Sequence, residues 1–417
     1  MTRIYSYTVP LEGDMVDAFC VVQKGFTDQF VYYDKRRPNR HMGLGRCIAI
    51  PTLEDADCTL QGPVDLQPVF FSFNRFDAGN PSPCDPLFSA FPQVALMLPE
   101  IVLSENETGA YLQVNSLGPV YEGRVARFLK MVKSARPRVR ETIPFSLEPD
   151  SREAWKRIVD ESLDAIRAGR LVKVVPSRRK LLRAARPFSS KDLLVNLIDG
   201  PARGTVLLYR YGDVFFCGCT PELLVRKQAS RVESMCLAGT CPAGANDEER
   251  AKFADELLHD EKNLREHGHV VNFIRSVFER DCYNVDIPRQ PGIMPLQHIQ
   301  HLHTPAAADV LDGVSVLDLC RQLHPTPALA GAPVGEALML LRRIEPYNRG
   351  FFGGACGYVD GSGNGEFAVA IRSGVFDGEI GYVYAGCGVV EGSDAAAEFD
   401  EIDMKLQTIL TAFNGEA

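Results

Sequence analysis

The stretch Gly363-Asn-Gly-Glu-Phe-Ala-Val-Ala-Ile-Arg372 places glycines before a run of apolar residues that ends in an arginine. The apolar run predicts a buried strand. A second strand is expected at residues 383–385. A helix is expected to follow, on which Glu398, Glu401 and Lys405 occupy positions i, i+3 and i+7 of one face. The C-terminal part should therefore form glycine-rich strands followed by one helix with an acidic face.

The chain changes character upstream of this stretch. In the first third, short apolar runs such as residues 18–22 are separated by Gly, Pro and Asp, which predicts strands and loops. Residues 136–149 are rich in proline and charge and are the best linker candidate. A helix is expected from Ser151, its N-cap, and residues 247–279 predict one long helix capped by Asp247.

Glu266 lies on an apolar stripe of that long helix. Glu266, Val270, Phe273 and Val277 follow at i, i+4, i+7 and i+11. A carboxylate on such a stripe is costly unless it is paired or bound to a metal. Spacing alone fits a glutamate in a surface ion pair at least as well. The acidic face of the C-terminal helix likewise fits a solvated surface.

The bulk composition excludes several classes of protein. With 417 residues, 45% hydrophobic and 24% charged, the chain is an ordinary globular protein. The net charge of −9 and the dispersed basic residues argue against nucleic-acid binding. No signal peptide and no membrane-spanning stretch is recognised. The cysteines lie in core-like contexts, which favours reduced thiols in a cytoplasmic protein.

Several further segments resemble the chorismate-utilising family, which includes isochorismate, salicylate, anthranilate and aminodeoxychorismate synthases. The resemblance covers residues 151–410, and its strength lies in the joint order and spacing of motifs that are weak singly. The motifs, besides those above, are Lys173-Val-Val-Pro-Ser-Arg178, Thr220-Pro-Glu-Leu-Leu224, Leu237-Ala-Gly-Thr240, Glu261-Lys-Asn-Leu-Arg-Glu-His267, His301-Leu-His-Thr304, Leu323-His-Pro-Thr-Pro-Ala-Leu329 and Ala385-Gly-Cys-Gly-Val-Val390.

The resemblance implies an α+β fold, in which two antiparallel β-sheets face each other and are flanked by helices. The site is expected in a cleft between them. Residues 1–140 would be the β-rich N-terminal part and residues 141–417 the chorismate-binding catalytic region, most simply as one integrated domain. The candidate linker at residues 136–149 then need not separate independent units.

The resemblance also implies a cofactor and a set of residues that bind the dianionic substrate. In the family, Mg²⁺ chelates one substrate carboxylate and is held by glutamates, which correspond here to Glu266 and Glu401, with Glu398 acting through water. Arg372 is expected to bind the other carboxylate, and Lys405 adds a second cation. The remaining substrate-binding positions are Ala238, Gly239, Thr240, Ala328, Leu329, Phe352, Gly386 and Gly388.

By motif position, Lys173 is the base that activates water, and Glu222 is the acid that protonates the leaving hydroxyl. Burial on an apolar strand would lower the pKa of Lys173, and an apolar neighbourhood would raise that of Glu222. Without the resemblance, each residue would be taken for an ordinary charged side chain at a strand. His301 is expected to orient the substrate.

A few positions favour an isochorismate synthase within the family. Ammonia-using relatives usually carry Gln at the position of Lys173, so no glutamine amidotransferase partner is expected. Aminodeoxychorismate synthases carry a Lys where Ala238 stands. Salicylate synthases tend to have a Tyr near Phe352, but a salicylate synthase stays the alternative, followed by a non-catalytic chorismate-binding paralogue. Asn263 replaces an acidic residue of some relatives. A monomer is expected, and menaquinone and siderophore pathways are both open.

Overall fold

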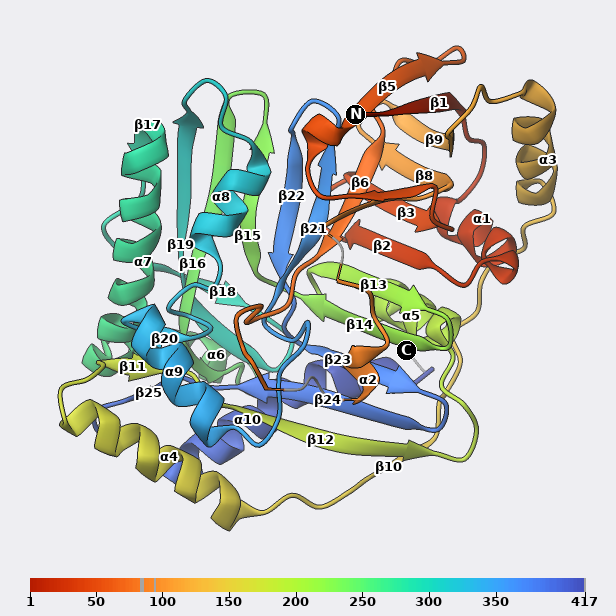
Figure 1. Cartoon of the computed structure of the whole chain (residues 1–417). Helices are drawn as coiled ribbons and strands as arrows, with labels where there is room; N and C mark the ends of the chain where they lie inside the picture. Colours follow the sequence, from red (N-terminus) through yellow and green to blue (C-terminus); the bar gives the residue numbers. More distant parts are fainter. Residues whose placement is uncertain (83–85, 94, 416–417) are drawn as a thin grey trace.

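The computed structural model describes residues 1–82, 86–93 and 95–415, and two large sheets dominate this part of the chain (Figure 1). All neighbouring strands pair antiparallel except β1 and β5, which are parallel. The larger sheet runs in the order β10 (Phe145–Leu147), β12 (Ser177–Ala184), β24 (Ile380–Gly386), β23 (Ser373–Asp377), β14 (Val214–Thr220), β13 (Thr205–Tyr211), β2 (Gln29–Asp34), β3 (Arg40–Leu44), β8 (Ile101–Asn106), β9 (Gly109–Ser116), β1 (Thr2–Pro10) and β5 (Ala56–Gln61).

The second sheet is built mostly from the middle of the chain. Its long strands β16 and β19 pair over their whole length, and β18 (Gly292–Pro295) pairs with β19 outside the main strand order. The order is β17 (Cys282–Asp286), β19 (Ile299–Val310), β16 (Arg231–Pro242), β15 (Leu223–Gln228), β22 (Gly365–Val369), β21 (Ala355–Asp360), β6 (Val69–Phe73), β7 (Leu96–Leu98) and β4 (Ile48–Ile50).

An aromatic core holds the two large sheets face to face. Phe30 of β2 stacks on Phe71 of β6 with ring centroids 5.6 Å apart, and Phe73 contacts Tyr209 of β13 at 5.0 Å. These side chains belong to one buried cluster contributed by both sheets. Aromatic residues suit strands because they cover a pleated, half-buried surface. The predicted α+β fold with facing antiparallel sheets is therefore confirmed.

Helices cover the outer faces of both sheets, as Figure 1 shows. On the larger sheet, α1 packs against β8, α5 against β13 and β14, and α10 against β24. On the second sheet, α7 packs against β16 and β19, and α8 against β15. The helices are α1 (Met15–Val22), α2 (Pro86–Ser89), α3 (Glu122–Val132), α4 (Arg152–Arg167), α5 (Ser190–Asp199), α6 (Asp247–His259), α7 (Glu261–Asp281), α8 (Val316–Leu323), α9 (Val334–Ile344) and α10 (Ala395–Leu410).

A small third sheet joins three short strands that the sequence did not predict as a unit. β11 (Lys173–Val174) lies between β20 (Gly331–Ala332) and β25 (Val389–Val390), and both pairings are antiparallel. α4 and α9 pack against it. This arrangement fixes the backbone of Lys173 beside the chain segment that enters α10.

Two sequence predictions about helices were wrong. Residues 18–22, predicted as a strand, belong to α1, whose N-cap Asp14 accepts hydrogen bonds from Val16 N and Asp17 N. The helix is apolar on most sides because it is buried, so its periodicity is weak. Residues 247–279 form two helices rather than one. They break at Asp260, whose side chain caps α7 by accepting from Asn263 N at 2.7 Å.

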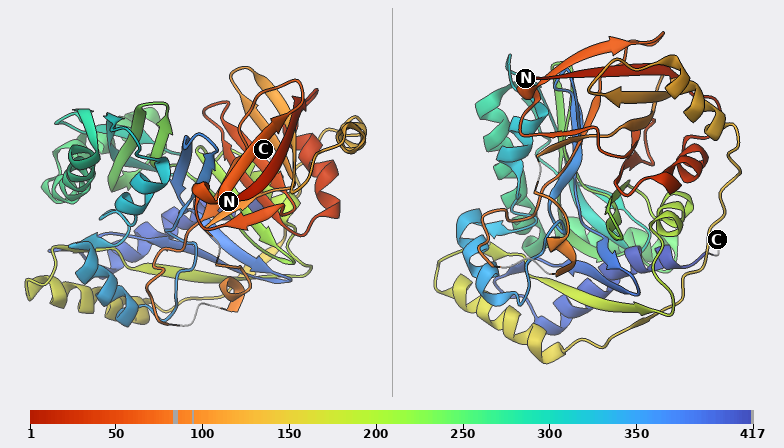
Figure 2. Two further views of the ribbon diagram at one scale, coloured as in Figure 1. Left: turned by 45° about the horizontal axis from the view of Figure 1, so that its top comes forward. Right: turned by 45° about the vertical axis from the view of Figure 1, so that its right-hand side comes forward.

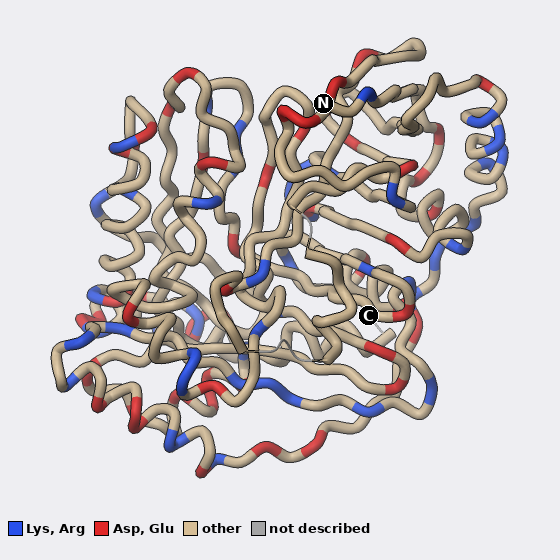
Figure 3. The backbone as a smooth tube through the Cα atoms, in the orientation of Figure 1, with Lys and Arg blue, Asp and Glu red and all other residues tan. Residues whose placement is uncertain are grey.

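Other local signals were interpreted correctly. Ser151 caps α4 by accepting from Ala154 N at 3.1 Å, and the helix ends before Gly169, which has φ of 70°. β1 and β5 form one edge of the larger sheet, close to the N-terminus (Figure 2). Lys and Arg are interspersed with Asp and Glu along the chain (Figure 3). Among the described helices, none has the length and apolar character that crossing a membrane would need.

Candidate active site

Glu222 lies where the chain crosses from one large sheet to the other. β14 ends at Thr220 in the larger sheet, and β15 begins at Leu223 in the second. Glu222 N donates to Thr220 Oγ1 at 3.2 Å, and its carbonyl accepts from Val369 N at 3.0 Å. Burial raises the pKa of Glu222 to about 7, although Arg372, Lys173 and Lys405 oppose the rise. A carboxyl group with this pKa can donate a proton near neutral pH.

A cavity of about 70 Å³ opens beside Glu222, and most of the predicted site residues line it. Lys173, Glu398 and Glu401 do not line it but contact residues that do. The cavity is smaller than a typical ligand pocket of about 300–1,000 Å³, so a ligand would displace the side chains that close it. The predicted residues in its wall are Glu222, Ala238, Gly239, Thr240, Glu266, His301, Ala328, Leu329, Phe352, Arg372, Gly386, Gly388 and Lys405.

Lys173 is fully buried on β11, and its ammonium group contacts the Glu266 carboxylate. The distance from Lys173 Nζ to Glu266 Oε1 is 2.8 Å. Burial alone would raise the pKa of Glu266, but Lys173, with Lys405 and Lys262, lowers it overall. A Cβ at position 388 would lie 2.4 Å from Glu266 Oε1 and 3.1 Å from Lys173 Cε. Gly388 is therefore needed because its backbone packs directly on this ion pair.

Each of the three predicted magnesium ligands is paired with a lysine. Besides the Lys173–Glu266 pair, Lys262 Nζ lies 3.1 Å from Glu398 Oε1 and Lys405 Nζ lies 2.5 Å from Glu401 Oε1. Within the described residues, no three His, Cys, Asp or Glu side chains are gathered closely enough to hold a metal ion. The carboxylates as they lie here are thus neutralised by side-chain cations.

The three glutamates nevertheless act electrostatically on the same lysine, Lys262. Burial lowers the pKa of Lys262, but Glu398, Glu266 and Glu401 more than offset this and raise it overall. Burial and the neighbouring Glu401 carboxylate also raise the pKa of Glu398. The carboxylate oxygens of the three glutamates are the ligand type that Mg²⁺ prefers. The residues fit this ion chemically, provided that they exchange lysine for it.

Arg372 is held in an unusual conformation between β22 and β23, directly before Ser373. Its φ is 53°, in the left-handed region, which costs about 1–3 kcal/mol for a residue that is not glycine. The side chain is buried, and within the described residues Arg372 Nε has no hydrogen-bond acceptor. Burial lowers the pKa of Arg372 to about 10, against the charges of Glu222 and Glu401. A buried guanidinium with an unused N–H is suited to an anionic ligand.

His301 is a neutral imidazole whose tautomer follows from its contacts. Its Nδ1 lies 3.1 Å from both Gly239 O and Thr240 Oγ1, and its Nε2 lies 3.4 Å from Arg372 Nη2. Burial, with Arg372 and Lys405, holds the pKa of His301 well below its ordinary range. Because a carbonyl only accepts, Nδ1 carries the proton and Nε2 accepts from Arg372. This histidine therefore supports the arginine and does not add charge.

A β-bulge shapes the wall formed by β16. The register of β16 against β19 shifts between Ala238 and Thr240, and Gly239 has φ of 82° at that point. Only glycine adopts this conformation readily, and the bulge turns the neighbouring side chains. Beneath it, His267 of α7 contacts Ala238 O at 3.3 Å and Thr304 Oγ1 at 2.8 Å. His267 thus ties the helix turn that carries Glu266 to the sheet.

Two basic residues at the site were not predicted from the sequence. Arg349 lines the cavity, pairs with Glu345 and donates to Val175 O at 2.6 Å. Lys262 holds Glu398. Lys262 lies within a quoted motif and Arg349 lies outside them, and neither lies on a patterned face that would have distinguished it from a surface cation. Lys405 also donates to Gly386 O at 3.1 Å, which joins α10 to the cavity wall.

A larger cavity of about 720 Å³ lies elsewhere, between the loop that follows β6 and helix α8. Its wall includes Asn74, Phe76, Arg321 and His324 and none of the predicted site residues. The chemistry expected from the sequence is therefore gathered at the smaller cavity.

The family model of the chorismate binding enzymes matches residues 4–414. The chain therefore belongs to the family of chorismate binding enzymes. It is 33% identical over 359 residues to isochorismate synthase MenF of Bacillus subtilis (strain 168), covering 84% of this chain and 75% of that protein. It is also 32% identical over 372 residues to the salicylate biosynthesis isochorismate synthase of Pseudomonas aeruginosa, covering 86% of this chain and 76% of that protein.

Other relatives carry a different name. The chain is 30% identical over 273 residues to anthranilate synthase component 1 of Saccharolobus solfataricus, covering 65% of this chain and 64% of that one. Among solved structures, MenF, the menaquinone-specific isochorismate synthase from Escherichia coli, matches with a TM-score of 0.81 and 23% identity, covering 99% of this chain and 95% of that one. A likeness at this identity shows the shared fold.

Proposed function

We propose that this protein is an isochorismate synthase that converts chorismate into isochorismate with Mg²⁺ as its cofactor. The observation that carries the proposal is a buried carboxyl with a raised pKa, Glu222, in the cavity wall, and a fully buried lysine, Lys173, that contacts Glu266 of the same wall. An acid and a base on one substrate are what the exchange of a hydroxyl between two ring carbons needs. The names of the relatives that share most of the chain support the same reaction.

Substrate binding falls to the cations in the cavity wall. Chorismate carries two carboxylates, and Arg372 offers a buried N–H without an acceptor among the described residues. Lys405 supplies a second positive charge from α10. A bidentate contact with the guanidinium would fix both the position and the plane of one carboxylate. His301, Thr240 and the glycines of the wall then leave room for the ring.

The reaction balances with two proton transfers by side chains of this chain. Lys173 takes a proton from the water whose oxygen bonds to C2, and Glu222 gives a proton to the hydroxyl that leaves C4 as water. The ring double bonds shift between these two carbons. Lys173 Nζ lies 2.8 Å from Glu266 Oε1 in this structure, so the role of base would require this contact to open.

The cofactor would be held by Glu266 and Glu401, with Glu398 acting through water. Bound there, Mg²⁺ supplies positive charge that neutralises and fixes a substrate carboxylate. The residues of the chain do the remaining work: they bind the ring, exclude bulk water and transfer protons.

Lys173 also separates this proposal from the amine-forming branch, because ammonia-using relatives usually carry Gln there. We therefore propose that the protein acts on chorismate without a glutamine amidotransferase subunit. Salicylate synthase remains the second candidate within the proposal, since it makes isochorismate first and then eliminates pyruvate. Phe352 is buried against Tyr384 with ring centroids 5.2 Å apart, and it brings no hydroxyl that could assist that elimination.

The test is incubation of the purified protein with chorismate and Mg²⁺, with isochorismate, salicylate, pyruvate and, in the presence of ammonium, anthranilate measured separately. We expect isochorismate alone. Stoichiometric pyruvate and salicylate would favour the second candidate, and anthranilate would refute the role of Lys173.

Lys173→Gln gives the matching variant. It should abolish conversion, with a loss of about 10²–10⁴-fold expected from removing a general base. Binding of chorismate in the presence of Mg²⁺, measured by calorimetry, should persist because Arg372 and Lys405 are unchanged. Retained turnover in this variant would contradict the assignment.

A further inference from the structure

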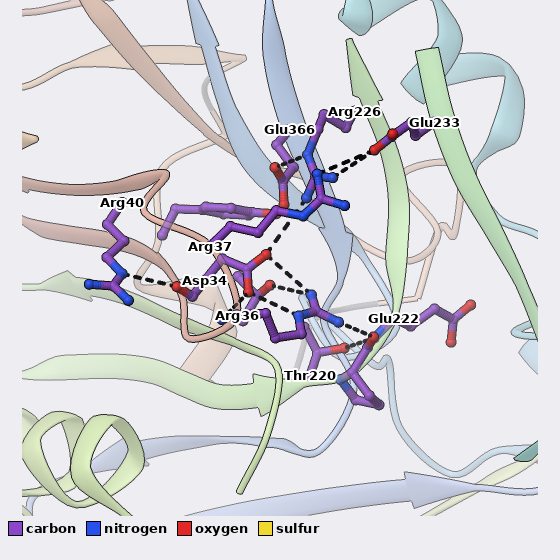
Figure 4. Close-up of polar contacts among 12 residues, drawn as sticks. Asp34, Arg36, Arg37, Arg40, Thr220, Glu222, Arg226, Glu233 and Glu366 are labelled. Carbon is purple, nitrogen blue, oxygen red and sulfur yellow. Dashed lines mark hydrogen bonds and ion pairs between the residues drawn. The ribbon is translucent and has the colours of Figure 1, made fainter. Parts of the chain in front are cut away.

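The backbone that carries Glu222 is a crossing of only two residues, Pro221 and Glu222, between the large sheets. Proline has no N–H, so Pro221 can be held only through its carbonyl. Arg36 Nη1 donates to that carbonyl at 3.2 Å. Arg36 is not part of the cavity wall and comes from the first tenth of the chain, so nothing in the catalytic motifs points to it. Figure 4 shows Arg36 directed at the crossing from the side of Asp34.

Arg36 is itself fixed by a carboxylate that is almost fully buried. Asp34 Oδ1 accepts from Arg36 N and from Arg36 Nε, both at 2.9 Å, and the Asp34 side chain is 1% exposed. Arg36 Nη2 also donates to Thr205 Oγ1 at 3.3 Å. Asp34, Thr205 and Thr220 are direct neighbours across β2, β13 and β14. The guanidinium therefore spans this row and reaches the residue that follows it.

The anchor of Arg36 connects both large sheets. Arg226 of β15 lies 3.6 Å from Asp34 and 2.8 Å from Glu233, and it also pairs with Glu366 of β22. Tyr32 of β2 donates to Glu366 at 2.7 Å. The cluster in Figure 4 is thus a bridge from the larger sheet to the second sheet, close to the crossing. Such a cluster is rigid because each charged group has several partners.

A close packing contact also limits movement of the crossing. Gly204 packs against it so closely that a Cβ there would lie 2.1 Å from Thr220 O and 3.1 Å from Pro221 Cα. Lys35 N donates to Gly204 O at 3.0 Å, which links this contact to the segment that carries Arg36. Packing thus limits the crossing on one side, and the hydrogen bond from Arg36 holds the Pro221 carbonyl.

We infer that Arg36 is a positioning residue for the reaction, because its bond to the Pro221 carbonyl sets the place of the Glu222 carboxyl in the cavity. The inference rests on the proposed function in assigning proton donation to Glu222. It does not depend on which product forms. Displacement of a catalytic group by about 1 Å can cost roughly 10²-fold in rate, so one backbone contact is enough to matter.

The experiment compares Arg36→Gln with Arg37→Gln. Arg37 is the next residue, is exposed and pairs with Glu233 at 3.5 Å, at the rim of the same cluster. For Arg36→Gln we expect kcat to fall about 10- to 100-fold while KM stays within about threefold of the wild type. Arg37→Gln should stay within about twofold of the wild type in both. The kcat of Arg36→Lys should lie between those of Arg36→Gln and the wild type. Lysine keeps the charge but loses the planar guanidinium that reaches three acceptors.

The same substitution made in the Glu222→Gln variant separates a positioning role of Arg36 from a general loss of structure. If Arg36 acts through Glu222, Arg36→Gln combined with Glu222→Gln should be no slower than Glu222→Gln alone, because effects on one unit do not multiply. An equal proportional loss in both backgrounds would overturn the inference, as would wild-type kcat in Arg36→Gln.

Hydrogen exchange of residues 218–224 provides a readout that needs no activity. Exchange in this segment should accelerate in Arg36→Gln and not in Arg37→Gln. Unchanged exchange in both would overturn the inference. If the wild type forms no isochorismate, the proposed function fails, while the exchange comparison still decides whether Arg36 holds the crossing.

Discussion

Two glutamates of one cavity behave in opposite ways. Glu222 and Glu266 both line the cavity, and the charge of Lys173 acts to lower the pKa of each. Burial raises the pKa of Glu222 to about 7, and none of the described residues forms an ion pair with its carboxyl. The pKa of Glu266 is lowered, because Lys173 Nζ lies 2.8 Å away and outweighs burial. A direct cation contact, and not depth of burial, decides the charge state.

The difference divides the site into an acid end and an ionic end. Glu222 stands on a backbone crossing between sheets and holds a proton near neutral pH. Glu266 stands on α7 among lysines and stays ionised, as do ligands for a divalent cation. Pairs of carboxyl groups whose environments separate their pKa values mark acid and base roles in enzymes. The comparison therefore supports the proposal that Glu222 donates the proton and that Glu266 would hold the cofactor.

The largest expected effect is on turnover. Glu222→Gln keeps the shape of the side chain but cannot donate a proton, so kcat should fall about 10²–10⁴-fold. In the wild type, kcat/KM should fall about tenfold per pH unit above about pH 7, because the Glu222 carboxyl ionises there. Steady-state rates of isochorismate formation against pH would show both effects.

The matched control for this variant is Asp213→Asn. Asp213 lies at the turn between β13 and β14 with a side chain that is 95% exposed, and its substitution should leave the rate unchanged. A Glu222→Gln enzyme with wild-type kcat would transfer the acid role to another group.

A smaller effect is expected on stability, and its sign separates the two glutamates. The pKa of Glu222 is higher in the folded than in the unfolded state, so its contribution to stability is complete at low pH and is lost as pH rises through about 7. The free energy of unfolding of Glu222→Gln, relative to that of the wild type, should therefore increase by on the order of 2–3 kcal/mol from about pH 5 to pH 8. Urea unfolding at the two pH values measures this difference.

Glu266→Gln should show the reverse sign. The pKa of Glu266 is lowered by folding, so its contribution is present above the unfolded pKa and is lost only in acid. At about pH 8, its loss also leaves Lys173 buried without its partner, so this variant should be less stable than the wild type. For Glu222, the contradicting outcome is a difference in free energy of unfolding between Glu222→Gln and the wild type that does not change with pH. It would mean that Glu222 is ionised in the folded protein.

The sequence could predict what is encoded locally in motifs. Glu222, Arg372 and His301 were identified from the segments that contain them, and the structure places all three at one cavity. The start of α7 was not predicted, because the cap at Asp260 lies inside a continuous helical pattern. The helical nature of residues 18–22 was also missed, since a helix that is buried on most sides has little periodicity.

Contacts between distant segments carry no such local signal. Arg36 and Pro221 are 185 positions apart, and no periodicity of either segment indicates that they meet. The lysine partners of the glutamates were missed for the same reason. Lys262 lies inside a quoted motif, but its pairing with Glu398 depends on how α7 and α10 pack around the cavity. Electrostatic roles at this site are therefore a property of the fold.

The smallest expected effect concerns the ionic end. If Glu266 and Glu401 bind the cofactor, Glu266→Gln and Glu401→Gln should each weaken Mg²⁺ binding about 10- to 100-fold, because a neutral amide is a poorer ligand than a carboxylate. Glu222→Gln should leave Mg²⁺ affinity unchanged, since Glu222 stands at the acid end. Calorimetric titration of the proteins with Mg²⁺, without substrate, measures these affinities.

Asp400→Asn is the control on the same helix. Asp400 follows the buried Glu398 on α10 but is exposed and pairs with Arg152 at the surface. Its substitution removes one negative charge without touching the cavity, so it should leave Mg²⁺ affinity unchanged. Loss of affinity in Asp400→Asn comparable to that in Glu401→Gln would show that helix charge alone attracts the ion. If instead Glu222→Gln lost affinity, the acid and ionic ends of the site would be one, and the contrast between the two glutamates would fail.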